Sequence, residues 1–199
     1  FYLKLSINSD TNIEKESEKK MDIESKVWEV LCSEEEIEDR ISELGEEISK
    51  EYEGKTLLVV SLLKGSFIFA ADLVRKIKIP LKVGFMMTSS YGHSETSSGS
   101  VSINMDIQDN LEGVDVLVVD DITDSGITMK YVTEHIMKKS PASVRSCVLL
   151  DKPERRQVDF EADYIGFSIE DKFVVGYGLN YGDFYRNIPY VFAVTNEDR

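Results

Sequence analysis

The sequence predicts an α/β protein with a central parallel β-sheet flanked by helices. Apolar, largely β-branched runs at 56–63, 115–120 and 143–150 indicate strands that are buried on both faces. Segments with helical spacing separate these runs, so strand and helix alternate along the chain. Such alternation predicts parallel strands joined by right-handed crossovers.

The first element is an amphipathic helix over about 33–52. Ser33-Glu34-Glu35-Glu36 has the form of a capping box, in which serine and glutamate satisfy backbone groups at the start of a helix. Apolar residues follow at spacings of four, three and four: Ile37, Ile41, Leu44 and Ile48. One face of this helix is therefore expected to be buried.

A strand–helix–strand unit follows. After the strand at 56–63, residues 64–77 indicate a loop and a helix, which Pro80 closes before a strand at 81–87. Residues 88–103 are rich in Ser, Gly and Thr and lack an apolar period. We expect a long mobile loop that acts as a lid, and a surface hairpin is the competing interpretation.

The second half continues the alternation and then changes. A helix at 125–139 links the strands at 115–120 and 143–150. Short apolar runs then follow without a long helix between them: 163–169, 173–179 and 190–194. We expect these runs to form a smaller subdomain.

Composition limits the class of protein. The 199 residues suffice for one domain, which we assign to 21–199, and the polar residues 1–20 are expected to form a flexible N-terminal extension. No window reaches the roughly 18 apolar residues of a membrane span, and no basic-then-apolar signal opens the chain. The net charge of −14 disfavours nucleic acid as a partner.

Cysteine and histidine are scarce. Cys32 and Cys147 show neither a disulfide framework nor a metal-ligand spacing, which fits a cytoplasmic protein. The two histidines, His93 and His135, do not predict a zinc site.

The stretch VLVVDDITDSGITM, residues 116–129, ends a buried strand in acids, a glycine and hydroxyl residues. Ligands of α/β sheets bind at this end of the strands. Gly126 lets the backbone approach a ligand, while Ser125 and Thr128 offer hydroxyls beside the free N–H groups of a helix start. These features predict a phosphate site.

Three aspartates accompany this turn. Asp120 and Asp121 would repel a phosphate but suit neutral hydroxyls or a divalent cation, so a sugar phosphate would satisfy both halves. For any one acid, including Asp124, helix capping or solvation is the simpler interpretation. Three carboxylates at one strand end, however, repel one another without an evident structural gain.

Common nucleotide motifs are absent from the sequence. There is no GxxxxGK[ST], and GYGLNYG at 176–182 misses the GxGxxG spacing by one residue. A P-loop NTPase or a dinucleotide enzyme is therefore disfavoured.

The stretch VVDDITDSGIT resembles the phosphoribosyl-pyrophosphate signature of the type I phosphoribosyltransferases. Other segments resemble the remaining loops of the hypoxanthine-guanine phosphoribosyltransferases, in the expected order: LLKGS at 62–66, SSYG at 89–92, LLDKPERR at 149–156, DKFVVGYGLNY at 171–181 and YRNIPYV at 185–191. The resemblance covers about 21–195. It implies the type I phosphoribosyltransferase fold, with a small hood subdomain from the C-terminal strands and the N-terminal segment.

The resemblance also implies an activity. A hypoxanthine phosphoribosyltransferase of purine salvage transfers ribose 5-phosphate from phosphoribosyl pyrophosphate to hypoxanthine, with guanine as a second substrate, and releases pyrophosphate. The products are IMP and GMP. The family implies Mg²⁺ as cofactor, a 6-oxopurine as ligand, and a homodimer or homotetramer. We expect no nucleic-acid or membrane partner, because of the net charge and the lack of a long apolar window.

Roles in the site follow from the same resemblance. Asp120 and Asp121 hold the ribose hydroxyls, directly or through magnesium. Asp124 is the general base or acid at a nitrogen of the purine five-membered ring. The sugar phosphate is cradled by three residues: Ser125, Gly126 and Thr128.

The other loops receive roles in the same way. Lys64 and Gly65 form the pyrophosphate loop, whose Leu63–Lys64 peptide is cis in relatives. Arg186 meets the pyrophosphate, and the mobile loop that closes over the centre contains Ser90 and Tyr91. Taken alone, Lys64 is more simply a solvated lysine and Arg186 a surface ion pair.

Four residues are implied to bind the purine: Ile122, Lys152, Phe173 and Val174. Lys152 would donate to the exocyclic oxygen, which selects oxopurines over adenine. Phe173 would stack on the ring, and Val174 would meet its edge through backbone groups. Plain core packing is the competing interpretation for Phe173.

Two positions depart from the family pattern. Relatives usually read GLDY or ALDY where this chain has an asparagine, Asn180, and that aspartate helps to bind a second magnesium. Asparagine keeps an oxygen ligand without the charge, so we expect weaker second-metal binding and altered guanine handling. Asp120 stands where many relatives have glutamate.

Two other functions remain open. A relative that prefers guanine or xanthine is compatible with Asn180. A non-catalytic sensor of phosphoribosyl pyrophosphate would lack the residues that handle the base, yet Asp124, Lys152 and Phe173 are all present.

Overall fold

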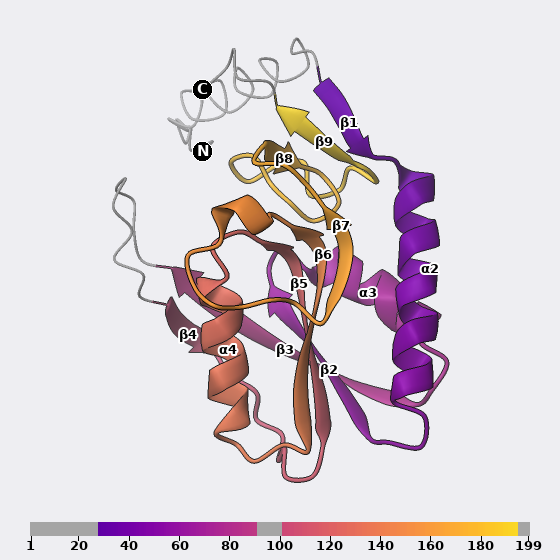
Figure 1. Cartoon of the computed structure of the whole chain (residues 1–199), viewed down its shortest axis with the longest axis vertical. Helices are drawn as coiled ribbons and strands as arrows, with labels where there is room; N and C mark the ends of the chain where they lie inside the picture. Colours follow the sequence, from indigo (N-terminus) through magenta and orange to yellow (C-terminus); the bar gives the residue numbers. More distant parts are fainter. Residues whose placement is uncertain (1–27, 91–100, 195–199) are drawn as a thin grey trace, which may run out of the picture.

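The computed structural model describes residues 28–90 and 101–194, which form a central sheet covered by helices and a small second sheet (Figure 1). The central sheet has six strands in the order β4-β3-β2-β5-β6-β7. Their bounds are β2 Leu57–Leu63, β3 Leu81–Ser90, β4 Val101–Met105, β5 Asp115–Thr123, β6 Ser143–Asp151 and β7 Tyr164–Ser168. All neighbours are parallel except β3 and β4, so the predicted α/β fold is confirmed.

The parallel strands bring their carboxyl ends to one edge of the sheet. β5 lies between β2 and β6, and Thr123 of β5 is in register with Asp151 of β6. The loops that leave these strands therefore emerge side by side, where ligands of α/β sheets bind.

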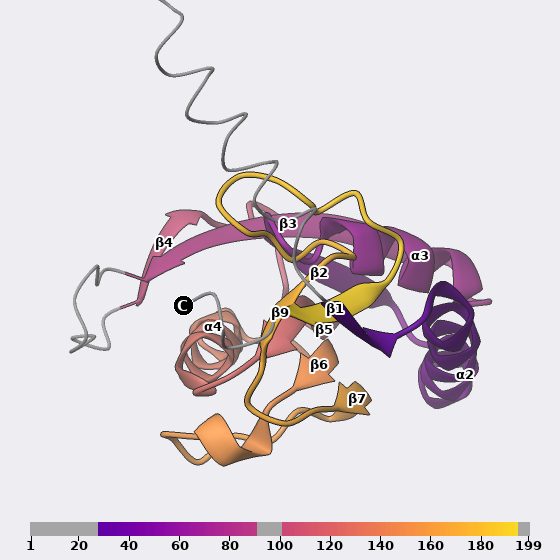
Figure 2. The same cartoon turned by 90° about the horizontal axis from the view of Figure 1, so that it is seen from above.

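Three helices cover the two faces of the sheet (Figure 2). α2 (Glu34–Glu51) and α3 (Phe67–Lys76) share a core cluster with Val59, whereas α4 (Ile127–Met137) shares the opposite cluster with Leu58. Successive residues of β2 thus point into different cores, and both are fully buried. This explains why the strand reads as a continuous apolar run.

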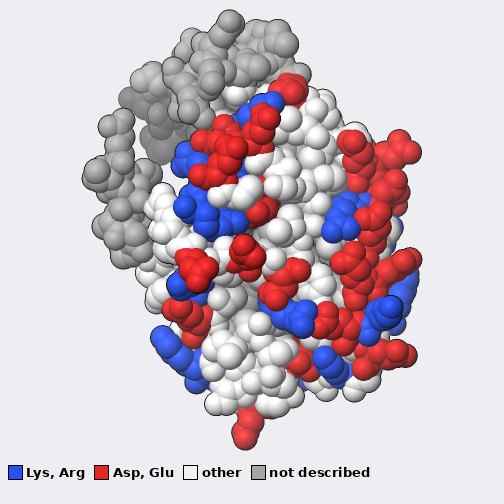
Figure 3. Space-filling view, in the orientation of Figure 1, with Lys and Arg blue, Asp and Glu red and all other residues white. Residues whose placement is uncertain are grey.

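The capping box at the start of α2 is confirmed. The Glu36 N–H donates to Ser33 Oγ (3.2 Å), and the Ser33 N–H donates to Glu36 Oε2 (2.8 Å). The predicted apolar stripe is buried: Ile37, Ile41, Leu44 and Ile48. Acidic side chains gather on the outer face of this helix, along the right edge of Figure 3.

The small second sheet forms a hood beyond the carboxyl ends of the central strands (Figure 1). It is antiparallel and consists of β1 (Trp28–Cys32), β9 (Val191–Val194) and β8 (Phe173–Val175), in that order. One strand from the N-terminal part therefore joins two from the C-terminal part, as the family resemblance implies.

Two sequence predictions are wrong. The run 163–169 does not join the hood, because β7 pairs in parallel with β6 and extends the central sheet. Only a short 3-10 helix, η1 (Pro153–Arg155), lies between these two strands, so the crossover lacks the long helix that would mark it in the sequence.

The predicted lid over 88–103 also begins and ends differently. β3 continues to Ser90 and pairs with β4, so residues 88–90 and 101–103 are strand rather than loop, whereas residues 91–100, on which the choice between lid and hairpin depends, lie outside the described ranges. Ser89 Oγ and Ser102 Oγ lie 2.9 Å apart across this strand pair. Tyr91 and residues 1–20 lie outside the described ranges. No helix within those ranges is long and apolar enough to span a membrane.

Candidate active site

The turn between β5 and α4, residues 124–126, is named the phosphate turn after its predicted role. Gly126 precedes the first helical residue with a φ of +79°, a conformation that favours glycine. A Cβ there would lie 2.9 Å from Arg156 Cδ and 3.2 Å from Val158 Cγ2, so there is no room for a side chain. The turn and Thr128 line a cavity of about 150 Å³, which brings the three predicted phosphate residues together.

Asp120 and Asp121 lie side by side near the end of β5. Burial and the charge of Asp121 raise the pKa of Asp120 well above its usual range. Burial likewise raises the pKa of Asp121, and the nearby Arg186 offsets only part of this effect. Burial and the charge of Asp121 therefore disfavour ionisation of Asp120, and a cation or a donor from a ligand would offset both effects.

This acid pair fits a magnesium ion that is shared with a ligand. Among residues 28–90 and 101–194, no three His, Cys, Asp or Glu side chains form a metal cage. Mg²⁺ is commonly bound by one or two carboxylates together with water and substrate phosphates, so two acids are a sufficient protein contribution. Asn180, the other predicted ligand, donates from Nδ2 to the Gly182 carbonyl.

Two glycines bring three loops together beside the acid pair. A Cβ at Gly65 would overlap the Asp121 carboxylate, and a Cβ at Gly178 would overlap the Gly65 carbonyl oxygen. Arg186 holds Gly178 in place: its Nη1 donates to the Gly178 carbonyl (2.5 Å), and the Gly178 N–H donates to the Arg186 carbonyl (2.9 Å). The predicted pyrophosphate loop thus contacts both the acid pair and the hood.

The pyrophosphate loop is also attached to β2. The Leu63–Lys64 peptide bond is cis, as the resemblance implies, and the Lys64 side chain is exposed. Ser66 Oγ donates to the Leu62 carbonyl (2.6 Å), which ties the end of the loop to the strand.

Asp124 and Lys152 face each other at the phosphate turn. Lys152 Nζ lies 3.5 Å from Asp124 Oδ1 and 3.8 Å from Asp171 Oδ1, and only 6% of Lys152 is exposed. Asp124 Oδ1 is buried and has no hydrogen-bond partner among the residues that the structure describes. A buried acceptor without a donor is unfavourable, so this oxygen is poised for a donor from outside the protein.

The predicted purine residues lie on the hood and at the end of β5. Phe173 is 40% exposed and contacts Tyr181 edge to face, with ring centroids 5.8 Å apart. A ring this exposed is not core packing and remains accessible for stacking. Val174 is buried within the hood, and Ile122 is partly buried against the core.

Sequence reasoning misses Arg156 and its partner Asp151. Arg156 Nη1 donates to the Asp124 carbonyl (2.6 Å), and Nη2 is paired with Asp151 Oδ1. Both residues belong to LLDKPERR, but neither has a spacing that points to Asp124. Only the register of β5 with β6 brings them together.

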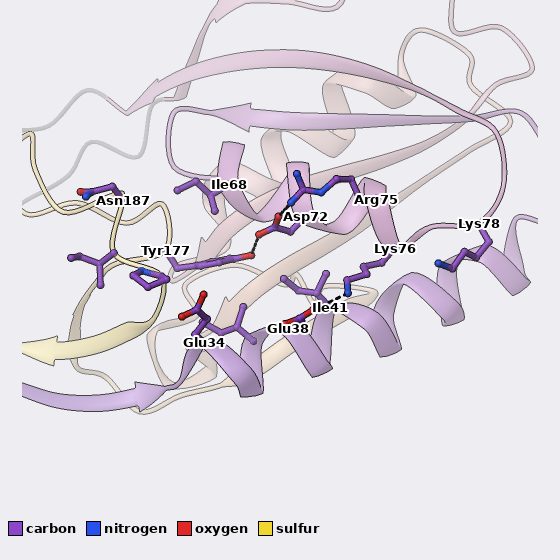
Figure 4. A pocket seen from close by; sticks show the side chains of 13 residues that line it. Glu34, Glu38, Ile41, Ile68, Asp72, Arg75, Lys76, Lys78, Tyr177 and Asn187 are labelled. Carbon is purple, nitrogen blue, oxygen red and sulfur yellow. Dashed lines mark hydrogen bonds and ion pairs between the residues drawn. The ribbon is translucent and has the colours of Figure 1, made fainter.

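A larger cavity, about 680 Å³, lies outside this site between α2, α3 and the hood (Figure 4). Figure 4 shows Tyr177 reaching Asp72 of α3, to which its hydroxyl donates, and the 3.3 Å ion pair of Lys76 with Glu38. None of the predicted site residues lines this cavity.

The family model named phosphoribosyl transferase domain matches residues 27–182. The hypoxanthine-guanine phosphoribosyltransferase of Aquifex aeolicus is 47% identical over 176 residues, which cover 88% of this chain and 99% of that protein. The hypoxanthine phosphoribosyltransferase of Salmonella typhimurium is 47% identical, with 84% of this chain and 95% of that protein covered. Among solved structures, the hypoxanthine phosphoribosyltransferase of Staphylococcus aureus matches with a TM-score of 0.82 at 44% identity, covering 85% of this chain and 92% of that one.

Proposed function

Because the chain belongs to the phosphoribosyltransferase family, in its hypoxanthine-guanine branch, we propose that it transfers ribose 5-phosphate from phosphoribosyl pyrophosphate to hypoxanthine in purine salvage. Guanine is the second substrate, and the products are IMP or GMP and pyrophosphate. The observation that carries this proposal is the buried Oδ1 of Asp124, which accepts no hydrogen bond among the described residues and lies between the phosphate turn and the Lys152 ammonium, 3.5 Å away.

The phosphate turn holds the 5-phosphate of the sugar. Ser125 and Thr128 donate from their hydroxyls, and Gly126 lets the backbone N–H groups at the start of α4 approach the phosphate oxygens. The helix start favours the negative charge.

Asp120 and Asp121 bind the ribose hydroxyls, directly or with Mg²⁺. When bound, the metal neutralises the charge that develops on the leaving pyrophosphate. As the bond from the anomeric carbon to pyrophosphate breaks, positive charge grows on the ribose, and the neighbouring carboxylates stabilise it. Burial raises the pKa of both aspartates in the free protein, and the charge of Asp121 raises that of Asp120 further, so these ligands offset the cost of ionising the pair.

Asp124 exchanges a proton with a nitrogen of the purine five-membered ring. The new bond joins the anomeric carbon to a purine nitrogen, and the ring proton moves to Asp124 Oδ1, which accepts no hydrogen bond from the described residues. General-base transfer of this kind contributes about a hundred- to ten-thousandfold to turnover.

The purine is oriented by Lys152, Phe173 and the hood backbone. Lys152 donates to the exocyclic oxygen of an oxopurine, whereas the amino group of adenine would face it with another donor. Phe173 stacks on the ring, Val174 contacts its edge, and Ile122 supports it from β5.

Pyrophosphate is held by the loop at Lys64 and Gly65 together with Arg186. Gly65 lies directly against the Asp121 carboxylate, and Gly178 lies directly against the Gly65 carbonyl oxygen. The pyrophosphate loop is therefore held beside the acid pair, so the leaving group and the ribose share one site. Ser90 and Tyr91 belong to the segment that excludes water from the sugar cation.

We extend the proposal to the organisation of the protein. Residues 21–199 form the catalytic domain, and residues 1–20 are an N-terminal extension. The enzyme works in the cytoplasm as a homodimer or homotetramer, with Mg²⁺ at Asp120 and Asp121 and a weaker second ion near Asn180.

The test is consumption of phosphoribosyl pyrophosphate with hypoxanthine, guanine, xanthine and adenine in parallel. We expect turnover with hypoxanthine, less with guanine, and none with adenine. A preference for guanine or xanthine would change the assigned substrate but not the reaction type. The observation that favours this alternative is the loss of charge at Asn180. No turnover with any of the four purines would contradict the proposal.

A further inference from the structure

A single guanidinium connects the general base to the frame of the sheet. Arg156 is nearly buried, with 17% of its side chain exposed. Its Nη1 donates to the backbone carbonyl of Asp124 (2.6 Å), and its Nη2 donates to Asp151 Oδ1. One edge of the side chain therefore holds a residue of the site, and the other holds a carboxylate at the end of β6.

Residues 156–157 also contact Ser125 and Gly126, the other two residues of the phosphate turn. The Gln157 N–H donates to the Ser125 carbonyl (3.0 Å), directly after Arg156 in the chain. The Arg156 Cδ lies 2.9 Å from the position that a Cβ of Gly126 would take, so its aliphatic stem packs against the turn. All three residues of the turn thus contact one short segment.

Asp151 anchors Arg156 to the central sheet. It ends β6, only 6% of its side chain is exposed, and its backbone is in register with Thr123 of β5. The Lys152 N–H donates to the Thr123 carbonyl (2.9 Å), and the Ile169 N–H donates to the Asp151 carbonyl (2.9 Å). The anchor therefore cannot shift without disturbing neighbouring strands.

We infer that Arg156, anchored by Asp151, is a positioning residue that sets the place of the Asp124 carboxylate and the shape of the phosphate turn. The inference rests on the proposed function. Because the Asp124 carbonyl is fixed, its Cα is fixed too, and the side chain can reach the purine nitrogen only from that point. The planar guanidinium is needed because it donates in two directions at once, which an ammonium on a flexible stem does not reproduce.

The first test compares Arg156→Lys with the wild type. Lysine keeps the charge beside Asp151, so the variant should fold, but its single nitrogen cannot span the Asp124 carbonyl and Asp151 as the two Nη atoms of the planar guanidinium do. We expect kcat to fall by about 100-fold, the size of effect that a misplacement of about 1 Å produces. The KM for phosphoribosyl pyrophosphate should rise, while the KM for hypoxanthine should change little, because Lys152 and Phe173 are untouched.

The second test is chemical rescue of Arg156→Ala by guanidinium. A cavity of about 310 Å³ adjoins the side chain and is lined by Asp151, Arg156 and Phe160, so a small cation can enter. Millimolar guanidinium should raise the kcat of this variant along a saturating curve. The matched control is Arg145→Ala, which breaks the Arg145–Glu51 pair (2.6 Å) at the other end of β6 and should show no rescue.

The outcomes separate this inference from the proposed function. A purely structural role would lower the melting temperature and leave kcat and KM of the folded enzyme unchanged in Arg156→Lys, which would overturn the inference. The affinity for phosphoribosyl pyrophosphate, measured by calorimetry, requires no turnover. A weaker affinity in Arg156→Lys supports the inference even if the wild type fails with every purine, and an unchanged affinity contradicts it.

Discussion

Two groups of carboxylates stand at the ends of neighbouring parallel strands, and the protein treats them in opposite ways. At the end of β6, Asp151 is matched by the guanidinium of Arg156. Near the end of β5, Asp120 and Asp121 are neighbours, and backbone N–H groups and the charge of Arg186 offset only part of the cost of burying them, so the pKa of each stays raised. Both groups are withdrawn from water within a few residues of the same edge of the sheet.

This difference in charge compensation distinguishes an acid that supports the structure, Asp151, from the acids of the candidate site, Asp120 and Asp121. A buried ion pair whose hydrogen bonds are satisfied holds a loop in place, although it does not by itself add much stability. Neighbouring buried acids cost stability in the free protein and repay it only when a ligand or cation arrives, which is a common property of active sites. We therefore propose that Asp151 positions the turn through Arg156, whereas Asp120 and Asp121 bind the ligand and its cation.

The largest expected effect on stability comes from breaking the balanced pair. Asp151→Ala leaves the Arg156 charge buried without a partner and should lower the free energy of unfolding by about 3–5 kcal/mol. Urea unfolding measures this change. Glu38→Ala is the control, because its 3.3 Å pair with Lys76 is largely exposed and should contribute about 0–1 kcal/mol. Equal losses of unfolding free energy in the two variants would show that the Asp151–Arg156 pair contributes no more than an exposed ion pair.

Gly65→Ala should disturb the Asp120–Asp121 pair and weaken ligand binding without unfolding the protein. The new methyl group would overlap the Asp121 carboxylate and push it out of place. We expect the affinity for phosphoribosyl pyrophosphate to fall about 100-fold, as for other displacements of about 1 Å, in a calorimetric titration. Gly84→Ala, whose methyl would lie at an ordinary 3.6 Å from Leu58, should bind like the wild type. Unchanged binding in Gly65→Ala would show that the contact carries no function.

Removing one charge of the acid pair should stabilise the free protein. Because the pKa of Asp120 is raised on folding, the folded state favours its protonated form, and the free energy of unfolding falls as pH rises from about 4 through the raised pKa. Asp120→Asn abolishes this loss and should gain about 0.5–2 kcal/mol at pH 7 while reducing activity.

Urea unfolding of both proteins between pH 4 and 8 follows this effect. The advantage of Asp120→Asn should grow with pH. A variant that is less stable than the wild type at pH 7 would mean that the acid pair is already balanced within the protein.

The smallest effect is expected where the chain departs from its family. Asn180→Asp adds a carboxylate and should lower the magnesium concentration for half-maximal activity about threefold, because the charge of the ligands sets the affinity for the cation. Activity titrated with Mg²⁺ at fixed phosphoribosyl pyrophosphate measures this. An unchanged requirement would show that position 180 does not contribute to a metal site.

Local signals in the sequence predict much of the fold and one half of the site. Continuous apolar runs identify β2, β5 and β6 because these strands are buried on both faces, and the capping box identifies the start of α2. Asp120, Asp121 and the phosphate turn lie within a short stretch of the chain, so their proximity needs no knowledge of the fold.

The missed features depend on pairing between distant segments. β7 follows β6 without a long helix, so its place in the central sheet rather than the hood follows only from the register. Arg156 lies 32 residues from Asp124, and the contact exists because β5 and β6 are neighbours. β4 (VSINM) does alternate apolar and polar residues, but it has only five residues and follows a Ser- and Gly-rich segment, so its pairing with β3 is seen only in the structure.

The most direct test of the account is a pair of measurements on Asp124→Asn: the affinity for phosphoribosyl pyrophosphate and the turnover of hypoxanthine. The account predicts an affinity close to that of the wild type, because the phosphate turn and the acid pair remain, and a kcat that is lower by about a hundred- to ten-thousandfold. Turnover at the wild-type rate would contradict it, because Asp124 would then not exchange the proton.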